Sequence, residues 1–281
     1  MACTAVQPPF STSTPIVPGT VSPLQPTPTL QEILTGPTAA PTETVAVAAT
    51  PAADTGWQQL RPGLERRIIR LVDEDEQLLE RLYVVRLEPG LFRVTIAYRP
   101  GEAQSMAAWQ AETGALLLVN GGFFTEEMAA TGRIVVEGVG SGTSYQGFGG
   151  MLAITADSVE IRSLVERPYD SNEALQYALQ SFPLLVRPGG EMGFPEEDNL
   201  QGRRTVVALD ENGRLLFILA PGGGFTLHEL SRYLVESDLG IEVALNLDGG
   251  TSTGLLLAEP AEEVPAFVLL PVVIAVYPLG E

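Results

Sequence analysis

The stretch Asn246-Leu247-Asp248-Gly249-Gly250-Thr251-Ser252-Thr253 lies between two apolar runs, at residues 241–245 and 255–258. This pattern predicts a buried strand, a tight glycine turn and then a second strand or the start of a helix, with Asp248 at the end of the first strand. Two adjacent glycines permit positive φ angles and let a ligand approach the backbone closely. The three hydroxyl groups that follow can donate to an anionic or hydroxylated ligand. The stretch therefore predicts a ligand site, although an ordinary tight turn with Asp248 accepting backbone N–H groups explains the same pattern.

A second stretch, Asn120-Gly121-Gly122-Phe123-Phe124, has the same arrangement. It follows the apolar residues 116–119, so a strand again ends in a small polar residue and two glycines. The two aromatic side chains could stack on a sugar, or they could belong to the core. A glycine-rich stretch at residues 138–150 follows, and it predicts a connector, a lid or a backbone N–H cradle for phosphate.

Two adjacent arginines, Arg203 and Arg204, precede Thr205 at the start of a predicted strand, residues 205–209. The simplest interpretation is a pair of solvated charges at a sheet edge, but strand alternation sends neighbouring side chains to opposite faces. The planar guanidinium of arginine binds two phosphate oxygens and stays protonated. The arginines therefore predict an anion-binding role, for which Arg204 is the first choice and Arg203 the second.

These stretches together resemble the phosphodiester glycosidase family. The pattern of that family is Asn-Gly-Gly-Phe-Phe, an Arg-Thr strand start, a helix opening Thr-Leu-x-Glu-Leu, and Asn-Leu-Asp-Gly-Gly followed by serines or threonines. The four motifs occur here in the same order, at residues 120–124, 204–205, 226–230 and 246–252, and the resemblance covers about residues 80–278. Thr251 departs from the pattern, which has glycine or another small residue there.

The resemblance implies a hydrolase that cleaves a glycosyl-phosphodiester linkage in a cell-surface or extracellular glycan. A phosphomonoester is a good leaving group, so one carboxylate acting as base or nucleophile could suffice. The predicted catalytic residues are Asp248 for that carboxylate, Arg204 for the leaving phosphate, and Asn120 for a sugar hydroxyl or the phosphate. The residues predicted to bind substrate are Gly121, Gly122, Phe123, Arg203, Thr205, Gly249, Gly250, Thr251, Ser252 and Glu229.

Glu229 has a second interpretation, because Thr226-x-x-Glu229 is also the capping box of a helix. Two other functions stay open for the whole site. In a metal-assisted phosphodiesterase, Asp248, Asn246 or Asn120 would hold Mg²⁺ or Ca²⁺ through oxygen ligands. A non-catalytic surface module would bind an anionic glycan without turnover. The favoured prediction is a glycosidase with no cofactor.

Composition excludes several other chemistries. All 16 positive charges are arginine, which excludes a P-loop, a Schiff-base lysine and a Ser–Lys dyad. One histidine, His228, excludes a multi-histidine metal site, and one cysteine excludes an internal disulfide. The net charge of −19 argues against nucleic acid or an anionic membrane surface as a partner.

Residues 1–56 differ from the rest of the chain, since they hold ten of its 22 prolines and only three charged residues. This composition predicts a disordered Pro/Thr/Ala-rich tether, followed by one domain at residues 57–281. Ala2-Cys3 before such a tether is typical of the mature end of a bacterial lipoprotein, with a free cysteine in a disordered tail as the alternative. We therefore expect an extracytoplasmic protein, lipid-anchored at Cys3 or secreted, with membrane contact only through that anchor.

The domain itself is expected to be α+β, with a mixed β-sheet core and about three helices. Many apolar or alternating runs predict strands, and a hairpin is expected from residues 151–155 and 159–163. Helices are expected at residues 103–112, 170–180 and 226–239, the second with Asp170 as its cap. No apolar run reaches 18 residues, and residues 267–276, which contain a proline, are expected to form a buried strand.

Overall fold

The computed structural model describes residues 53–280, which lie within a compact unit spanning Thr50–Glu281. Cys3 and almost all of the predicted tether lie outside the described residues. Within residues 53–56, the Asp54 carboxylate accepts a hydrogen bond of 2.9 Å from Nε of Arg67. Contacts of the folded part therefore begin before the predicted boundary at residue 57.

The described chain forms three β-sheets, and every strand pairing in them is antiparallel. The large sheet contains, in spatial order, β1 (Gln58–Arg61), β2 (Leu64–Val72), β3 (Leu78–Leu87), β14 (Leu215–Phe225), β13 (Gly202–Asp210), β15 (Ile241–Asn246), β11 (Leu184–Arg187) and β12 (Glu191–Met192). The β10 sheet contains β7 (Val139–Ser141), β6 (Ile134–Val136), β10 (Tyr177–Ser181), β8 (Gly150–Ile154) and β9 (Val159–Ser163). The β5 sheet contains β17 (Glu262–Val264), β16 (Leu255–Leu257), β5 (Leu117–Asn120), β18 (Val272–Pro278) and β4 (Phe92–Tyr98).

Two α-helices accompany the sheets in the described part of the chain, α1 (Met106–Thr113) and α2 (Leu227–Glu236). Each has a side-chain cap at its start, from Ser105 and Thr226 respectively. Short 3₁₀ turns, η1 (Pro89–Leu91) and η2 (Gly250–Ser252), complete the helical segments. Neither α-helix has the length and hydrophobicity needed to cross a lipid bilayer.

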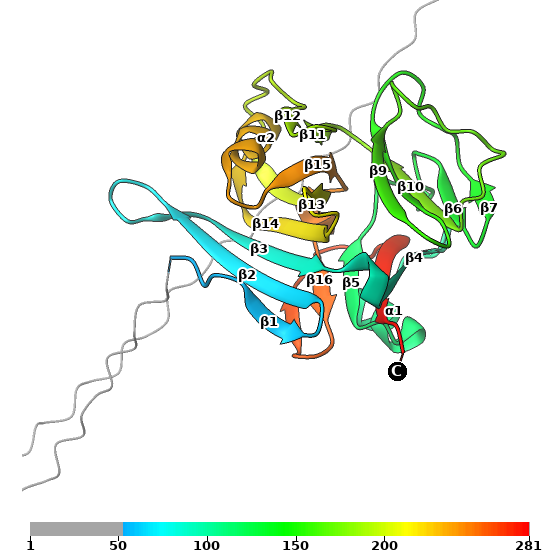
Figure 1. Ribbon diagram of the computed structural model, residues 1–281, viewed down its shortest axis with the longest axis horizontal. Coiled ribbons are helices and arrows are strands. Elements are labelled where there is room, and N and C mark those ends of the chain that lie inside the picture. Colours follow the sequence, from blue (N-terminus) through cyan, green and yellow to red (C-terminus); the bar gives the residue numbers. More distant parts are fainter. Residues whose placement is uncertain (1–52, 281) are drawn as a thin grey trace, which may run out of the picture. The chain divides into compact units, whose positions relative to one another are not determined.

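The central strands of the large sheet are buried on both faces, which explains the continuous apolar sequence at the start of β14. Phe217 packs into a core shared with Ile274 of the β5 sheet and Leu152 of the β10 sheet. Its neighbour Ile218 points the other way, into a second core with Leu234 of α2. Figure 1 shows α2 beside β11 and β12. Successive strand residues face opposite sides, so burial on both sides requires an unbroken apolar run.

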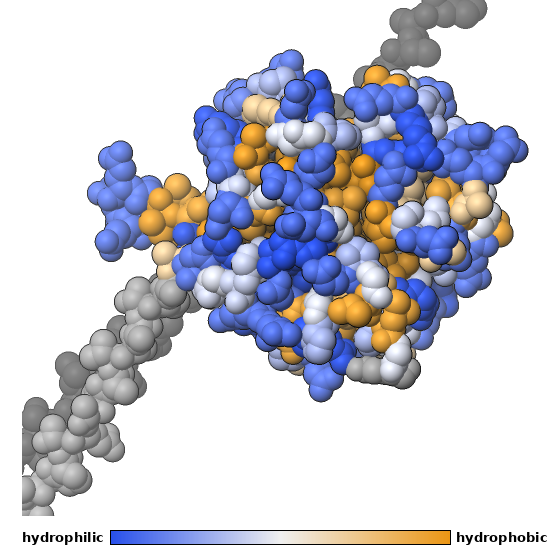
Figure 2. Space-filling view, in the orientation of Figure 1, coloured by the Kyte–Doolittle hydropathy of each residue, from blue (hydrophilic) through white to orange (hydrophobic). Residues whose placement is uncertain are grey.

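The β2–β3 hairpin projects from the large sheet, on the left of Figure 1. Val72, Leu78 and Leu79 are exposed near its tip, at 44%, 53% and 57%. The space-filling view in Figure 2 shows this apolar surface followed by a hydrophilic end, which the acidic residues 73–76 form.

The predicted α+β class, with its mixed sheet and about three helices, was wrong. The sheets are wholly antiparallel, and residues 170–180 form a loop and then β10 instead of a helix. Strand β10 pairs with β8 along its whole length, from Tyr177 opposite Ile154 to Ser181 opposite Gly150. The helical spacing of apolar residues was therefore misleading, because tertiary strand pairing overrides local helix preference.

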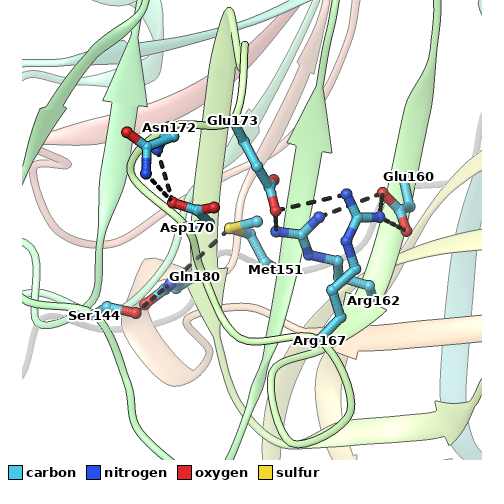
Figure 3. A network of polar contacts seen from close by, with 9 residues as sticks. All are labelled: Ser144, Met151, Glu160, Arg162, Arg167, Asp170, Asn172, Glu173 and Gln180. Atoms are coloured by element: carbon cyan, nitrogen blue, oxygen red, sulfur yellow. Dashed lines mark hydrogen bonds and ion pairs between the residues drawn. The ribbon is translucent and has the colours of Figure 1, made fainter.

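The two residues expected to cap that helix, Asp170 and Glu173, make other contacts in the structure. The Glu173 carboxylate accepts two hydrogen bonds from Nη2 of Arg162, at 2.9 and 2.8 Å, and lies 3.5 Å from Nη2 of Arg167 (Figure 3). Asp170 instead accepts from the backbone N–H of Asn172 at 2.9 Å, which is the pattern of an Asx turn. Glu173 thus binds arginines of and after β9 and is not available to cap a helix.

Candidate active site

The two glycine motifs meet where the large sheet joins the β5 sheet. Strand β15 lies between β13 and β11 and ends at Asn246. Beyond it, the N–H of Leu247 donates to the carbonyl of Thr205 at 2.8 Å, and the N–H of Asp248 donates to the carbonyl of Gly121 at 3.1 Å. The turn η2 then leads into β16, which pairs with β5 of the first motif. The predicted strand ends therefore lie side by side.

The Asn120 side chain fastens this junction. Its Nδ2 donates to the carbonyl of Asp248 at 2.7 Å. Its Oδ1 accepts from the hydroxyl of Thr205 at 2.8 Å and from the N–H of Gly254 at 3.0 Å. Asn120 and Thr205 are each 0% exposed. Both side chains predicted to contact substrate are thus enclosed by protein and connect the backbones of the two sheets.

The Asp248 carboxyl group is partly buried beside η2. Its Oδ1 accepts from the N–H of Gly249 at 2.9 Å, and the Ser252 hydroxyl hydrogen-bonds the same carboxyl group. Burial raises the pKa of Asp248, while the bonds from Ser252 and Gly249 lower it, and the net change is upward. Within residues 53–280 no ion pair joins this carboxylate to an arginine.

Arg203 lies on the face of β13 that carries Thr205. Its Nη2 donates to the carbonyls of Thr253 and Pro265, at 3.1 and 2.8 Å. The guanidinium carbon lies 4.2 Å from the ring centre of Phe267, a cation–π distance. Its Nε and Nη1 are covered by protein and have no hydrogen-bond partner among the described residues, and burial lowers the pKa of Arg203.

Arg204, the first choice from the sequence, lies on the opposite face of β13. Its guanidinium donates to the carbonyls of Phe225, at 3.3 Å, and Leu200. Burial also lowers the pKa of Arg204, which the charge of Asp198 partly offsets. The alternation expected from the sequence is present, and it puts Arg203 rather than Arg204 beside the turn that follows Asp248.

Close packing or a positive φ angle explains why glycine occupies the motif positions. A Cβ on Gly249 would come within 2.7 Å of the carbonyl oxygen of Arg203. Gly250 has open space around it but a φ of +58°, the left-handed region that glycine adopts most easily. Gly121 and Gly122 are buried, and a Cβ on Gly122 would lie 3.0 Å from a backbone oxygen. These residues bring backbones together, and Thr251 is exposed beside them.

Aromatic side chains gather next to the first motif. The ring of Phe123 lies 4.6 Å from that of Phe182, which is 37% exposed. Tyr145 and Phe148, from the glycine-rich stretch, contact Phe182 at 5.5 and 5.6 Å. We call these four residues the aromatic cluster. The sequence singled out only Phe123; the other three come from two distant loops, and the glycine-rich stretch that holds two of them was the one available signal.

Glu229 forms the capping box of α2. Its carboxylate accepts from the N–H of Thr226 at 2.9 Å, and its own N–H donates to the Thr226 hydroxyl at 3.1 Å. The capping interpretation is therefore confirmed. As to metals, the described residues contain no group of three or more His, Cys, Asp or Glu side chains placed to hold an ion.

The match to a known family covers most of this site. The sequence profile of the phosphodiester glycosidases matches residues 113–276, which include both glycine motifs and the two arginines. The chain therefore belongs to the phosphodiester glycosidase family, a family of hydrolases. The resemblance inferred from the sequence is confirmed.

Solved structures share the fold. The catalytic domain of zebrafish N-acetylglucosamine-1-phosphodiester alpha-N-acetylglucosaminidase, auto-inhibited by its pro-peptide, aligns with a TM-score of 0.63 at 18% identity, over 78% of this chain and 85% of that one. A protein of Synechocystis aligns with a TM-score of 0.52 at 15% identity, over 77% of this chain and 62% of that one. At such identities the likeness concerns the fold alone. A comparison with curated protein sequences gives no match.

Proposed function

We propose that the protein hydrolyses a glycosyl-phosphodiester and that Asp248 is its catalytic base. The observation that carries this proposal is the position of the Asp248 carboxyl group: it is oriented by Ser252 and Gly249 where the two family motifs meet. Partial burial raises its pKa, and a carboxylate of raised pKa is a better proton acceptor.

In the proposed reaction a water molecule attacks the anomeric carbon. The new bond joins the water oxygen to that carbon, the bond from carbon to the phosphate oxygen breaks, and the proton of the water passes to Asp248. The electron pair of the broken bond leaves with the phosphate, which departs as a phosphomonoester. Such a group leaves without strong acid assistance, so a second carboxylate is not needed.

Arg203 is the proposed partner of the departing phosphate. It lies beside Thr253 and projects toward Phe267, and two of its nitrogens have no partner among the described residues. Phe267 is 66% exposed, so its ring can move aside to admit a phosphate oxygen. In a chain of net charge −19, a local guanidinium offsets the repulsion of an anionic substrate. Arg204, on the other face of β13, is proposed to hold the loop through Leu200.

Asn120 and Thr205 are proposed to position Asp248 rather than to touch substrate, because their polar atoms bind each other and the backbone. The aromatic cluster is proposed to receive the sugar. Phe123 lies two residues after Gly121, whose carbonyl accepts the N–H of Asp248, and Phe148 and Phe182 are 46% and 37% exposed. Aromatic rings present apolar faces on which the C–H surface of a sugar can pack.

The test is sugar release from a panel of glycosyl-phosphodiesters. We expect Asp248→Asn to lower kcat by roughly 10²–10⁴-fold, the usual contribution of a positioned acid or base. Asp157→Asn, an exposed carboxylate in the turn between β8 and β9, is the matched control and should behave as wild type. Normal turnover by Asp248→Asn would remove that residue from the mechanism.

The same assay with and without EDTA separates the alternatives. Loss of activity in EDTA would favour the metal-assisted phosphodiesterase, with Asp248 as an Mg²⁺ or Ca²⁺ ligand. Saturable glycan binding that survives Asp248→Asn, without turnover of any substrate, would favour the binding module.

We also propose that the protein acts outside the cytoplasm on a phosphorylated glycan. This rests on Ala2-Cys3 and the proline-rich stretch that follows. Lipid attachment at Cys3 predicts that Cys3→Ser moves the protein from the membrane fraction to the soluble fraction, while an unchanged distribution would refute the anchor.

A further inference from the structure

We propose that an apolar pocket beside Asp248 receives an apolar aglycone, so that the substrate joins a sugar through phosphate to an alkyl, prenyl or aryl group. This rests on the proposed hydrolase function and adds to it the class of the group that leaves with the phosphate.

The pocket has a volume of about 680 Å³, within the range of roughly 300–1,000 Å³ common for small-molecule sites. Four parts of the chain line it: the start of α1, the end of the first glycine motif with the segment after it, the turn η2, and the stretch from β17 into the loop before β18. Its apolar lining consists of Met106, Phe124, Met128, Phe267, Val268 and Leu269. In the region of α1, the space-filling view shows apolar surface among hydrophilic residues (Figure 2).

The pocket is continuous with the proposed catalytic turn. Its polar lining consists of Ser105, Thr251, Ser252 and Glu263. Of these, Ser252 is the residue whose hydroxyl binds the Asp248 carboxyl group. The N–H of Phe267 donates to the carbonyl of Thr251 at 2.7 Å, which fastens the apolar loop to the turn. A group that fills the pocket therefore lies one side chain away from the proposed base.

The first glycine motif separates this pocket from the aromatic cluster. Phe123 packs on Phe182 in the cluster, whereas the next residue, Phe124, lines the pocket. Both follow Gly121, whose carbonyl binds the N–H of Asp248. A substrate that lies across Asp248 can thus place its sugar on the cluster and its leaving group in the pocket.

The chemistry of the lining selects the occupant. Phe267, Val268 and Leu269 are consecutive apolar residues with 66%, 39% and 54% of their surface exposed. Covering them with hydrocarbon is favourable, because apolar area is removed from water. Arg203 lies against Phe267 at the edge of this loop, where a phosphate attached to the hydrocarbon would meet a guanidinium. An anion joined to an apolar chain fits this arrangement better than a second sugar, which would leave the apolar wall exposed.

The experiment compares two substrates with the same sugar and phosphate, one with a methyl and one with an octyl aglycone, both below the micelle concentration. We expect wild type to favour the octyl substrate by about tenfold or more in kcat/KM. Leu269→Gln should reduce this octyl-to-methyl ratio severalfold. Leu78→Gln is the matched control: Leu78 is 53% exposed, close to the 54% of Leu269, but lies on the projecting hairpin, so this variant should keep the wild-type ratio.

Each outcome decides between explanations. Equal kcat/KM for the two substrates in wild type, or an equal loss of both in Leu269→Gln, would overturn the aglycone pocket and leave the hydrolase proposal standing. No turnover of either substrate would refute both proposals. If a second copy of the chain covers the apolar loop, sedimentation will show a dimer that Leu269→Gln dissociates, and the octyl preference will be absent; this too would overturn the pocket.

Discussion

Replacing Asn120 with alanine is expected to destabilise the domain strongly. The substitution removes three short bonds, to the carbonyl of Asp248 at 2.7 Å, the hydroxyl of Thr205 at 2.8 Å and the N–H of Gly254 at 3.0 Å, and a longer one of 3.3 Å to the carbonyl of Gly121. The Asn120 side chain is 0% exposed, so water cannot replace the lost partner without rearrangement. Leaving a buried polar group without a partner costs about 1–3 kcal/mol. With partial relaxation, the loss for three groups is about 3–5 kcal/mol in the free energy of unfolding.

Urea titration followed by tryptophan fluorescence measures this loss, since Trp57 and Trp109 both lie in the described domain. Thr205→Val is the matched control. It removes one hydroxyl but leaves Oδ1 of Asn120 bound to Gly254, so it should cost only about 1 kcal/mol. A loss below 1 kcal/mol for Asn120→Ala, or one equal to that of Thr205→Val, would show that the amide does not fasten the two sheets together.

Three further outcomes are expected. The Asp248 carboxyl group has a raised pKa in the folded protein, so it binds its proton more tightly there, and stability falls as the pH rises above the ordinary aspartate pKa of 3.8. Asp248→Asn should therefore be more stable than wild type at pH 7 and lose this advantage at pH 3. Urea titrations that show no such pH dependence would contradict the raised pKa. Gly249→Ala should lower the free energy of unfolding by about 1–3 kcal/mol, because its Cβ would meet the Arg203 carbonyl. Gly250→Ala should lower it by about 1 kcal/mol, since only the φ of +58° opposes alanine there. A larger loss of stability for Gly250→Ala than for Gly249→Ala in thermal unfolding would refute the close contact. Glu229→Ala should cost about 1 kcal/mol through the lost cap, and a fall in kcat beyond tenfold would instead assign Glu229 to substrate binding.

Local sequence patterns predicted much of the fold where a segment determines its own structure. The spacing of Thr226 and Glu229 predicted a capping box that the structure contains, and the expected hairpin at residues 151–155 and 159–163 corresponds to β8 and β9. The helix predicted at residues 170–180 was wrong. The apolar spacing of these residues fits a helix, but their structure is decided by pairing with β8, a strand more than twenty residues away. The prediction of a mixed sheet was wrong for a similar reason. Whether two strands run parallel or antiparallel depends on which strands pair, and composition does not show this.

In the candidate site, too, some features could be predicted from local sequence and others depend on contacts between distant segments. Sequence motifs indicated that Asn120 and Asp248 belong together, and the structure places them in contact. Alternation also predicted that Arg203 and Arg204 face opposite sides, yet nothing in the sequence tells which side carries the site. The structure puts Arg203 on the face of β13 that carries Thr205, where it contacts Thr253. The aromatic partners Tyr145 and Phe182 could not be found, because loops bring them together only in three dimensions.

The position of β18 has a consequence for how the protein acquires its site. This strand, Val272–Pro278, lies between β4 and β5 in the β5 sheet. Strand β5, which contains Asn120, therefore pairs with a strand about 150 residues further along the chain. Contacts of such separation form slowly, because a long loop must close first. The candidate site is therefore expected to assemble only once residues 272–278 are available to pair with β5.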